Sequence, residues 1–255
     1  MVELVNHEKL LFSFPELHRD AECEISFLQT ERVNPTTRLH KLPNTRHCYP
    51  LGHIQDYADR VPSSWLRQGG ALLAIKPEDA VQIIFHSPHK YPFAIKVACG
   101  KKCAISGESW TEHLVRGTSV DSRGNEKLIQ NYLCVPPQNI LAGFQVSTEE
   151  VRQFVAQDVK RNGTSDAISV GGLQIQVFPI KPEIYERRLE EKRQKDKEWP
   201  RVLYHITLIP EVELSDGGRI TQHIFSDSAD SVKDYCFIDK SRVFIHLANL
   251  DVDCL

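Results

Sequence analysis

Two histidines and two cysteines stand in close pairs on either side of one short apolar segment. His86 and His89 precede the stretch Phe93–Val97, and the cysteine pair follows it at Cys99 and Cys103. Tetrahedral zinc accepts two His and two Cys ligands. A five-residue strand is about 16 Å long, whereas the ligands of one zinc ion lie roughly 4 Å apart. We therefore predict that the two pairs point away from each other, that they bind no metal, and that the chain uses no cofactor.

Three carboxylates are the candidates for acid–base chemistry. Asp56 and Asp59 are three residues apart in a segment with helical spacing, so they are neighbours on one face, and Glu108 is the third candidate. Arg60 is adjacent to the pair, which favours a solvated ion-pair face. A carboxylate-dependent hydrolase-like enzyme stays open as the alternative function.

Motifs for nucleophilic or phosphate chemistry are missing from the sequence. The segment Gly107–Thr111 lacks the second glycine of a nucleophile elbow, and no P-loop, dinucleotide fingerprint or H-E-x-x-H sequence occurs. Ser109 and Glu112 match a capping box, in which each side chain satisfies a free backbone N–H group of the other residue. We therefore interpret Ser109 as a helix cap and predict no catalytic residue.

Aromatic residues offer a binding site instead. Trp65, Trp110 and Tyr132 could together form a concave apolar surface, as ligand sites often do. The alternative is that all three pack in the core, where large aromatic side chains are usually found. The sequence leaves both interpretations open.

Strands must position these residues, because period-two alternation recurs along the chain. The pattern is clearest in Phe93–Val97, Leu173–Val177 and Val243–Leu247. We expect Val81–Phe85 to pair with Phe93–Val97 across the turn between them, and the segment Tyr91–Glu108 to form a β-hairpin. These patterns predict a mainly β fold, α+β at the margin: an antiparallel β-sandwich-like domain with a few short peripheral helices.

Five segments carry helical signals. Lys181–Arg201 is rich in charges of both signs and has only a thin apolar stripe, so it predicts a solvated helical connector. The others are shorter. Two predictions remain open at the capping box of residues 147–150. One is a helical turn that leads into a strand, and the other is a strand over the whole segment. The four shorter segments are Ile54–Arg60, Ser64–Gln68, Ser109–Arg116 and Ser147–Glu150.

Composition excludes several classes of protein. The 255-residue chain has 31 basic and 34 acidic residues, hence a net charge of −3, which argues against general nucleic-acid binding. No apolar run approaches the roughly 20 residues needed to span a bilayer, and the N-terminus shows no signal peptide. Seven irregularly spaced cysteines favour free thiols in a reducing compartment. We expect a soluble cytoplasmic protein.

A series of segments in one order resembles an uncharacterised family of bacterial, fungal and protist β-rich proteins, some of them labelled integral membrane proteins. The resemblance covers roughly residues 49–179 and implies a β-rich fold without an established activity. The segments are H-I-Q-D-Y-A-D-R-V-P at 53–62, P-F-A-I-K-V at 92–97, S-G-E-S at 106–109, I-Q-N-Y-L-C-V-P-P-Q at 129–138, V-R-Q-F-V-A at 151–156 and G-G-L-Q-I-Q-V-F-P at 171–179.

These observations lead to one domain scheme and one functional hypothesis. We predict an N-terminal β-rich segment at 1–48 packed on a main β-sandwich-like domain at 49–255, with the charged helical connector at 181–201. We predict a non-catalytic soluble binding or interaction module. Its partner is an unknown protein or small-molecule ligand, and neither nucleic acid nor a membrane.

Overall fold

The fold was analysed in a computed structural model. It describes residues 1–33, 39–41, 44–120, 124, 126–147, 150–156, 172–198, 213–215, 219–220 and 241–248. The elements in the first half of the chain are β1 Val2–Val5, β2 Lys9–Ser13, β3 Glu22–Thr30, β4 Leu39–Lys41, β5 Thr45–Cys48, β6 Leu51–His53, η1 Ile54–Tyr57, α1 Ser63–Gln68, β7 Ala71–Ala74, β8 Ala80–His86, β9 Phe93–Cys99, β10 Lys102–Cys103, β11 Arg116–Val120 and β12 Glu126–Gln130. Those in the second half are β13 Leu133–Val135, β14 Ile140–Leu141, β15 Gly143–Ser147, β16 Glu150–Val155, β17 Leu173–Pro179, α4 Pro182–Glu198, β18 Glu213–Ser215, β19 Arg219–Ile220 and β20 Ser241–Ala248.

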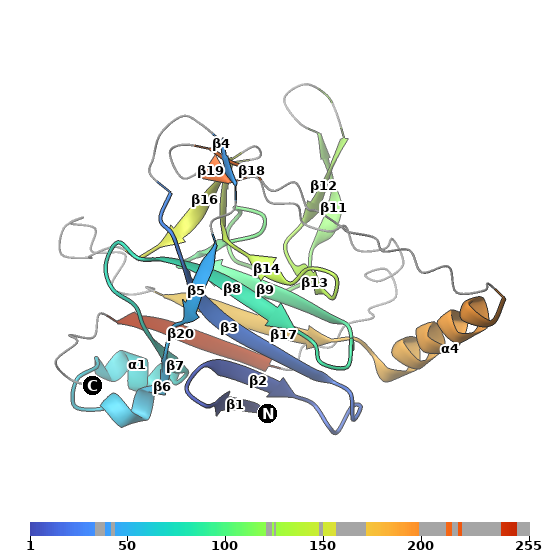
Figure 1. The fold of residues 1–255 in the computed structure, drawn as a ribbon, viewed down its shortest axis with the longest axis horizontal. Helices are drawn as coiled ribbons and strands as arrows, with labels where there is room; N and C mark the ends of the chain where they lie inside the picture. The colour runs from blue at the N-terminus through green and yellow to red at the C-terminus, as the bar shows by residue number, and fades with distance from the viewer. Residues whose placement is uncertain are drawn as a thin grey trace.

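Two packed sheets form the body of the molecule (Figure 1). One sheet has eleven described strands, whose main path is β1-β2-β3-β8-β16-β19-β18-β4, and the other has seven, with the path β10-β9-β17-β20-β7-β6. A single apolar cluster fills the space between them. It takes Phe27 and Ile83 from the first sheet and Ile95, Ile175 and Ile245 from the second. The mainly β, sandwich-like fold predicted from the alternation is confirmed.

Nearly all described strand pairs are antiparallel, and the exception is β20 with β7. The order of strands also shows where the first 48 residues lie in the sheets. Strand β3 from this segment pairs with the whole of β8, from Glu24 opposite His86 to Thr30 opposite Ala80. Strands from residues 1–48 therefore share the eleven-stranded sheet and its core with strands from the rest of the chain, and the domain scheme stays a prediction.

The expected pairing of Val81–Phe85 with Phe93–Val97 is wrong. These residues belong to β8 and β9, which lie in different sheets, so the connection between them crosses the sandwich. Tyr91 is fully buried in this connection, and its backbone carbonyl accepts a hydrogen bond from the Ser87 hydroxyl at 2.9 Å. The β-hairpin predicted within Tyr91–Glu108 does form, from β9 and β10.

The helical predictions had mixed outcomes. Helix α1 is present, while Ile54–Arg60 contains only the short 3-10 helix η1. The first capping box is wrong as a helix signal; at the second, residues 148 and 149 lie outside the described part of the chain, and from Glu150 on the strand alternative is the one observed. Ser109–Arg116 forms a loop that leads into β11, and Glu150 begins the strand β16, because strand pairing outside these short segments outweighs the local signal.

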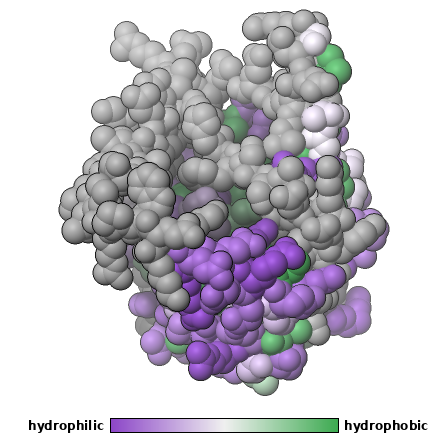
Figure 2. All heavy atoms as spheres, turned by 90° about the vertical axis from the view of Figure 1, so that its right-hand side faces the viewer, coloured by the Kyte–Doolittle hydropathy of each residue, from purple (hydrophilic) through white to green (hydrophobic). Residues whose placement is uncertain are grey.

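Helix α4 confirms the charged helix predicted within Lys181–Arg201 and projects from one end of the body (Figure 1). Ile184 and Tyr185 are buried at its base, Leu189 packs against the core, and the residues from Glu190 to Gln194 are exposed. The surface seen from this side is mostly hydrophilic where the structure describes it (Figure 2). No helix in the described part of the chain is long and apolar enough to cross a membrane.

Candidate functional site

A fully buried lysine lies at the centre of the most unusual polar arrangement in the structure. Lys96 is in the middle of β9, and alternation turns it away from Ile95 and Val97, which face the core between the sheets. Its Nζ lies 4.6 Å from the centroid of the Trp110 ring. Burying an ammonium group costs free energy unless hydrogen bonds compensate for the lost hydration, so the groups around Nζ are informative.

The lysine holds the loop that follows Trp110. Its Nζ donates hydrogen bonds to the backbone carbonyl of Thr111 and, at 2.6 Å, to that of His113. Charge-assisted hydrogen bonds of this kind are shorter and stronger than neutral ones. The side chains of Thr111 and His113 remain exposed. A buried cation therefore fixes the backbone of an exposed segment.

Asn131 holds the same loop from a second direction. Its Nδ2 donates to the His113 carbonyl at 3.1 Å and to the Thr111 hydroxyl at 3.3 Å, and its Oδ1 accepts from the Val115 N–H at 2.8 Å. We call residues 110–115 the clamped loop. With two fully or nearly buried side chains bonded to its backbone, the clamped loop is held in one shape.

The clamped loop is also connected to the β9–β10 hairpin and to β20. The Trp110 N–H donates to the Lys101 carbonyl at 2.9 Å, beside the β9–β10 hairpin. Glu112 accepts two hydrogen bonds from Arg242 on β20, at 2.6 and 3.3 Å. Gln176 on β17 is opposite both Lys96 and Arg242, so the loop lies across the outer face of three adjacent strands.

The proposed aromatic surface is only partly assembled. Tyr132 lies near Lys96 on the same face of β9, but it is fully buried against Ala94 and Phe178 and presents no surface. Trp65 lies on α1, between β6 and β7 at the opposite edge of the seven-stranded sheet. Trp110 alone of the three is a half-buried ring beside an exposed loop.

The three candidate carboxylates do not converge. Asp56 and Asp59 are exposed beside β6, at one edge of the seven-stranded sheet. Glu108 is exposed beside β10 at the other edge, where its carbonyl accepts the Cys103 N–H at 2.8 Å. Strands β7, β20, β17 and β9 lie between the two groups, so they cannot act together on one substrate bond.

The candidate zinc ligands are separated as the strand length predicted. His86 and His89 lie before β9, and the His89 ring is 3.6 Å from Glu22, while Cys99 is the last residue of β9 and Cys103 lies on β10. Cys99 is opposite Lys102 and Cys103 is opposite Ala98, so the two cysteines also face opposite sides of their hairpin. Among the described residues, no group of three or more His, Cys, Asp or Glu side chains could hold a metal ion.

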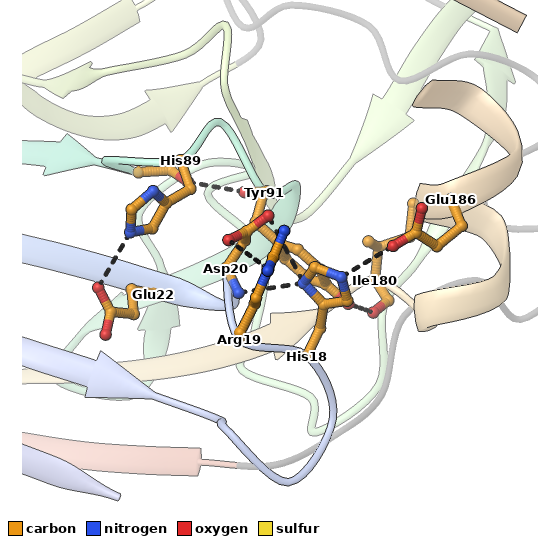
Figure 3. A network of polar contacts seen from close by, with 9 residues as sticks. His18, Arg19, Asp20, Glu22, His89, Tyr91, Ile180 and Glu186 are labelled. Carbon is orange, nitrogen blue, oxygen red and sulfur yellow. Dashed lines mark hydrogen bonds and ion pairs between the residues drawn. The ribbon is translucent and has the colours of Figure 1, made fainter. Parts of the chain in front are cut away.

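A second polar cluster lies at the base of α4 (Figure 3). The His18 Nδ1 accepts the Asp20 N–H at 3.0 Å, so the ring proton is on Nε2, which donates to Glu186 at 2.9 Å. The same ring stacks on Tyr91 and meets the edge of Tyr185. The Tyr91 hydroxyl donates to the Ile180 carbonyl at 2.6 Å. Since its polar atoms are satisfied within the fold, we interpret this cluster as the anchor of α4.

Sequence reasoning missed the residues that build both clusters. Lys96 has the period-two position of a solvent-facing residue, and nothing local shows that a loop will cover it. Arg242 and His18 stand in no motif, and Asn131 lies in the segment I-Q-N-Y-L-C-V-P-P-Q, which gives no sign of its role in the loop. Tyr185, in the thin apolar stripe of the charged helix, was the one usable signal for the anchor.

The buried tyrosines predict a loss of stability in alkali. Burial raises the pKa of Tyr91 well above its usual value, and the nearby charges of Glu183 and Glu186 add to this effect. Burial also raises the pKa of Tyr185 and Tyr49. The unfolded chain therefore loses these protons first, near pH 10, so the free energy of unfolding falls as the pH rises above that value.

Tyr91→Phe tests this directly. At pH 7 the variant is expected to be less stable by about 1 kcal/mol, because the hydrogen bond to Ile180 is lost. Above about pH 10 the difference from the wild type should shrink, since the variant has no phenol to ionise on unfolding. Urea unfolding at a series of pH values measures both. A difference that stays constant up to pH 11 would contradict the assignment.

Comparisons of the chain with family models, curated proteins and solved structures gave no match. The family resemblance of residues 49–179 therefore stays a prediction.

Proposed function

We propose that the protein is a non-catalytic binding module that presents the clamped loop to a partner protein, and that it belongs to the uncharacterised family its motifs resemble. One observation carries this proposal: fully buried Lys96 and nearly buried Asn131 hold the backbone of a loop whose side chains at Thr111, Glu112 and His113 are exposed. A cytoplasmic location, which the free cysteines favour, is part of the same proposal.

Energetics support a role for the loop beyond folding. Burying a lysine has a desolvation cost of several kcal/mol, which its hydrogen bonds must offset. Mobile surface loops need no such support. A loop fixed before binding loses less conformational entropy when a partner docks, which strengthens binding. Trp110 adds the kind of rigid aromatic anchor that often dominates the energy of an interface.

Comparison of two tryptophan variants tests the proposal. Immobilised wild-type protein, Trp110→Ala and Trp65→Ala are each exposed to an extract of the cells that produce the protein, and retained proteins are quantified by mass spectrometry. We expect a partner held by the wild type and by Trp65→Ala, and retained about tenfold less by Trp110→Ala, because the ring is an interface anchor. Trp65 is the matched control, since it is also half-buried but lies at the opposite edge of the sheet.

A second variant covers the case in which Trp110→Ala unfolds, because that ring also packs against the core. His113→Glu changes an exposed side chain of the loop and should weaken retention without lowering the thermal midpoint. Retention that is equal in all variants would overturn the proposal. So would hydrolytic turnover in a broad substrate panel that is lost in Asp56→Ala or Glu108→Ala.

A further inference from the structure

The neighbourhood of the clamped loop has the opposite charge to the protein as a whole. The described part of the chain has five cationic and two acidic residues that lie within two residues of this loop in the sequence or are connected to it or to Ser109 by a contact, which gives 5 − 2 = +3, with one of the cations being the buried Lys96. The whole chain has a net charge of −3, so the remainder carries −6. The cations are Lys96, Lys101, Lys102, Arg116 and Arg242, and the acids are Glu108 and Glu112.

Contacts within the fold, and not only positions in the sequence, bring these residues together. Lys96 lies over the Trp110 ring, and Lys101 bonds the Trp110 N–H through its carbonyl. Lys102 forms an isolated β-bridge with Ser109, directly before the clamped loop. Arg242 reaches the loop from β20 through Glu112. These contacts therefore bring the half-buried Trp110 and the backbone of the neighbouring cationic residues into one patch around the clamped loop.

Two of the lysines are available for a ligand. Lys101 and Lys102 are exposed at the turn of the β9–β10 hairpin, and neither forms an ion pair within the described residues. Uncompensated like charges at adjacent positions raise the local potential and attract anionic groups. Carboxylates of a partner would pair with these two ammonium groups while its apolar side chains contact Trp110.

We propose that the clamped loop takes an acidic segment of a partner protein, in which carboxylates alternate with apolar side chains. This inference rests on the proposed function and adds the chemical class of the partner. Charge complementarity carries it: a +3 patch on a chain whose remainder is −6 selects a short anionic segment and repels a long one. Glu108 and Glu112 interrupt the patch, which disfavours the continuous phosphates of a nucleic acid.

The probe is a fluorescein-labelled peptide that alternates glutamate and leucine, measured by anisotropy with the full chain at low and at physiological salt. The comparators are the same peptide with glutamine in place of glutamate, and an oligothymidylate of equal length. We expect the acidic peptide to bind best and to weaken as salt rises, because exposed ion pairs are screened.

Charge reversal locates the site. Lys101→Glu combined with Lys102→Glu should weaken binding of the acidic peptide about tenfold, because two attractions become repulsions. Arg60→Glu combined with Arg67→Glu is the matched control: it makes the same charge change on exposed residues near α1, at the opposite edge of the sheet, and should leave binding unchanged.

Three results would overturn the inference: no binding of the acidic peptide at low salt, equal loss in both charge-reversal variants, or tighter binding of oligothymidylate. Retention of the partner from cell extract distinguishes failure of this inference from failure of the proposed function. If retention depends on Trp110 but not on Lys101 and Lys102, the loop binds a partner of another chemistry. If retention depends on none of them, both proposals fail.

Discussion

Gly70→Ala is expected to lower the free energy of unfolding by about 3 kcal/mol or more. Gly70 has φ +109°, a conformation that L side chains rarely adopt, and a Cβ at this position would overlap the carbonyl oxygen of Phe244. That oxygen belongs to the backbone of β20, which pairs in parallel with β7 directly after Gly70. Since no side chain can rotate away, the clash must be relieved by separating two strands of the sheet.

The preceding residue supplies the control. Gly69 also has a positive φ, of +68°, but a Cβ there would meet nothing within 4 Å. Gly69→Ala should therefore lower the free energy of unfolding by only about 1 kcal/mol, the cost of holding alanine in the left-handed backbone conformation. Urea unfolding of both variants, with the midpoint and slope compared, measures the difference. Equal losses would mean that close approach to Phe244 does not constrain this position.

Lys96→Ala is expected to lower the free energy of unfolding by about 2–4 kcal/mol. The change removes two charge-assisted hydrogen bonds to the clamped loop and leaves a cavity where the buried aliphatic stem packed. Lys96→Met keeps most of the stem and removes the charge. Its loss of stability should be smaller, because no large cavity forms and an ammonium group is no longer buried.

The two Lys96 variants should nevertheless share one effect, a loosened loop. Amide hydrogen exchange at Trp110 and Val115, whose N–H groups are bonded at the ends of the clamped loop, should accelerate in both. Lys102→Ala, at an exposed position of the same hairpin, is the control and should change stability by less than about 0.5 kcal/mol. If Lys96→Ala behaves like Lys102→Ala, the lysine does not hold the loop.

Local sequence patterns predicted which face of a strand is buried better than they predicted which strands pair. The alternation of Phe93, Ile95 and Val97 correctly identified a buried strand face, because side chains of a strand point alternately to its two sides. The same residues were assigned the wrong neighbour. Alternation contains no information on which strand supplies the hydrogen bonds, and β9 pairs with β17, about eighty residues later, rather than with β8.

The candidate site shows the same division. Its aromatic member, Trp110, was identified from residue type, while Lys96, Asn131 and Arg242 were not. Each of the three acquires its role from contacts with residues distant in the sequence, as when Arg242 bonds Glu112 across 130 positions. The capping box at Ser109 was misleading for a related reason: a strand pairing that includes Arg116 opposite Gln130 outweighed a single helical turn.

The sequence by itself determined the β-rich class, the buried faces of the main strands and the charged helix α4, because these depend on the order of apolar and polar residues along the chain. Only the tertiary structure decided which strands share a sheet, that the candidate carboxylates and zinc ligands lie apart, and that Lys96 is buried beneath the clamped loop. Burial and hydrogen-bond partners are set by distant segments that fold over a residue, and no local pattern records which segment that will be.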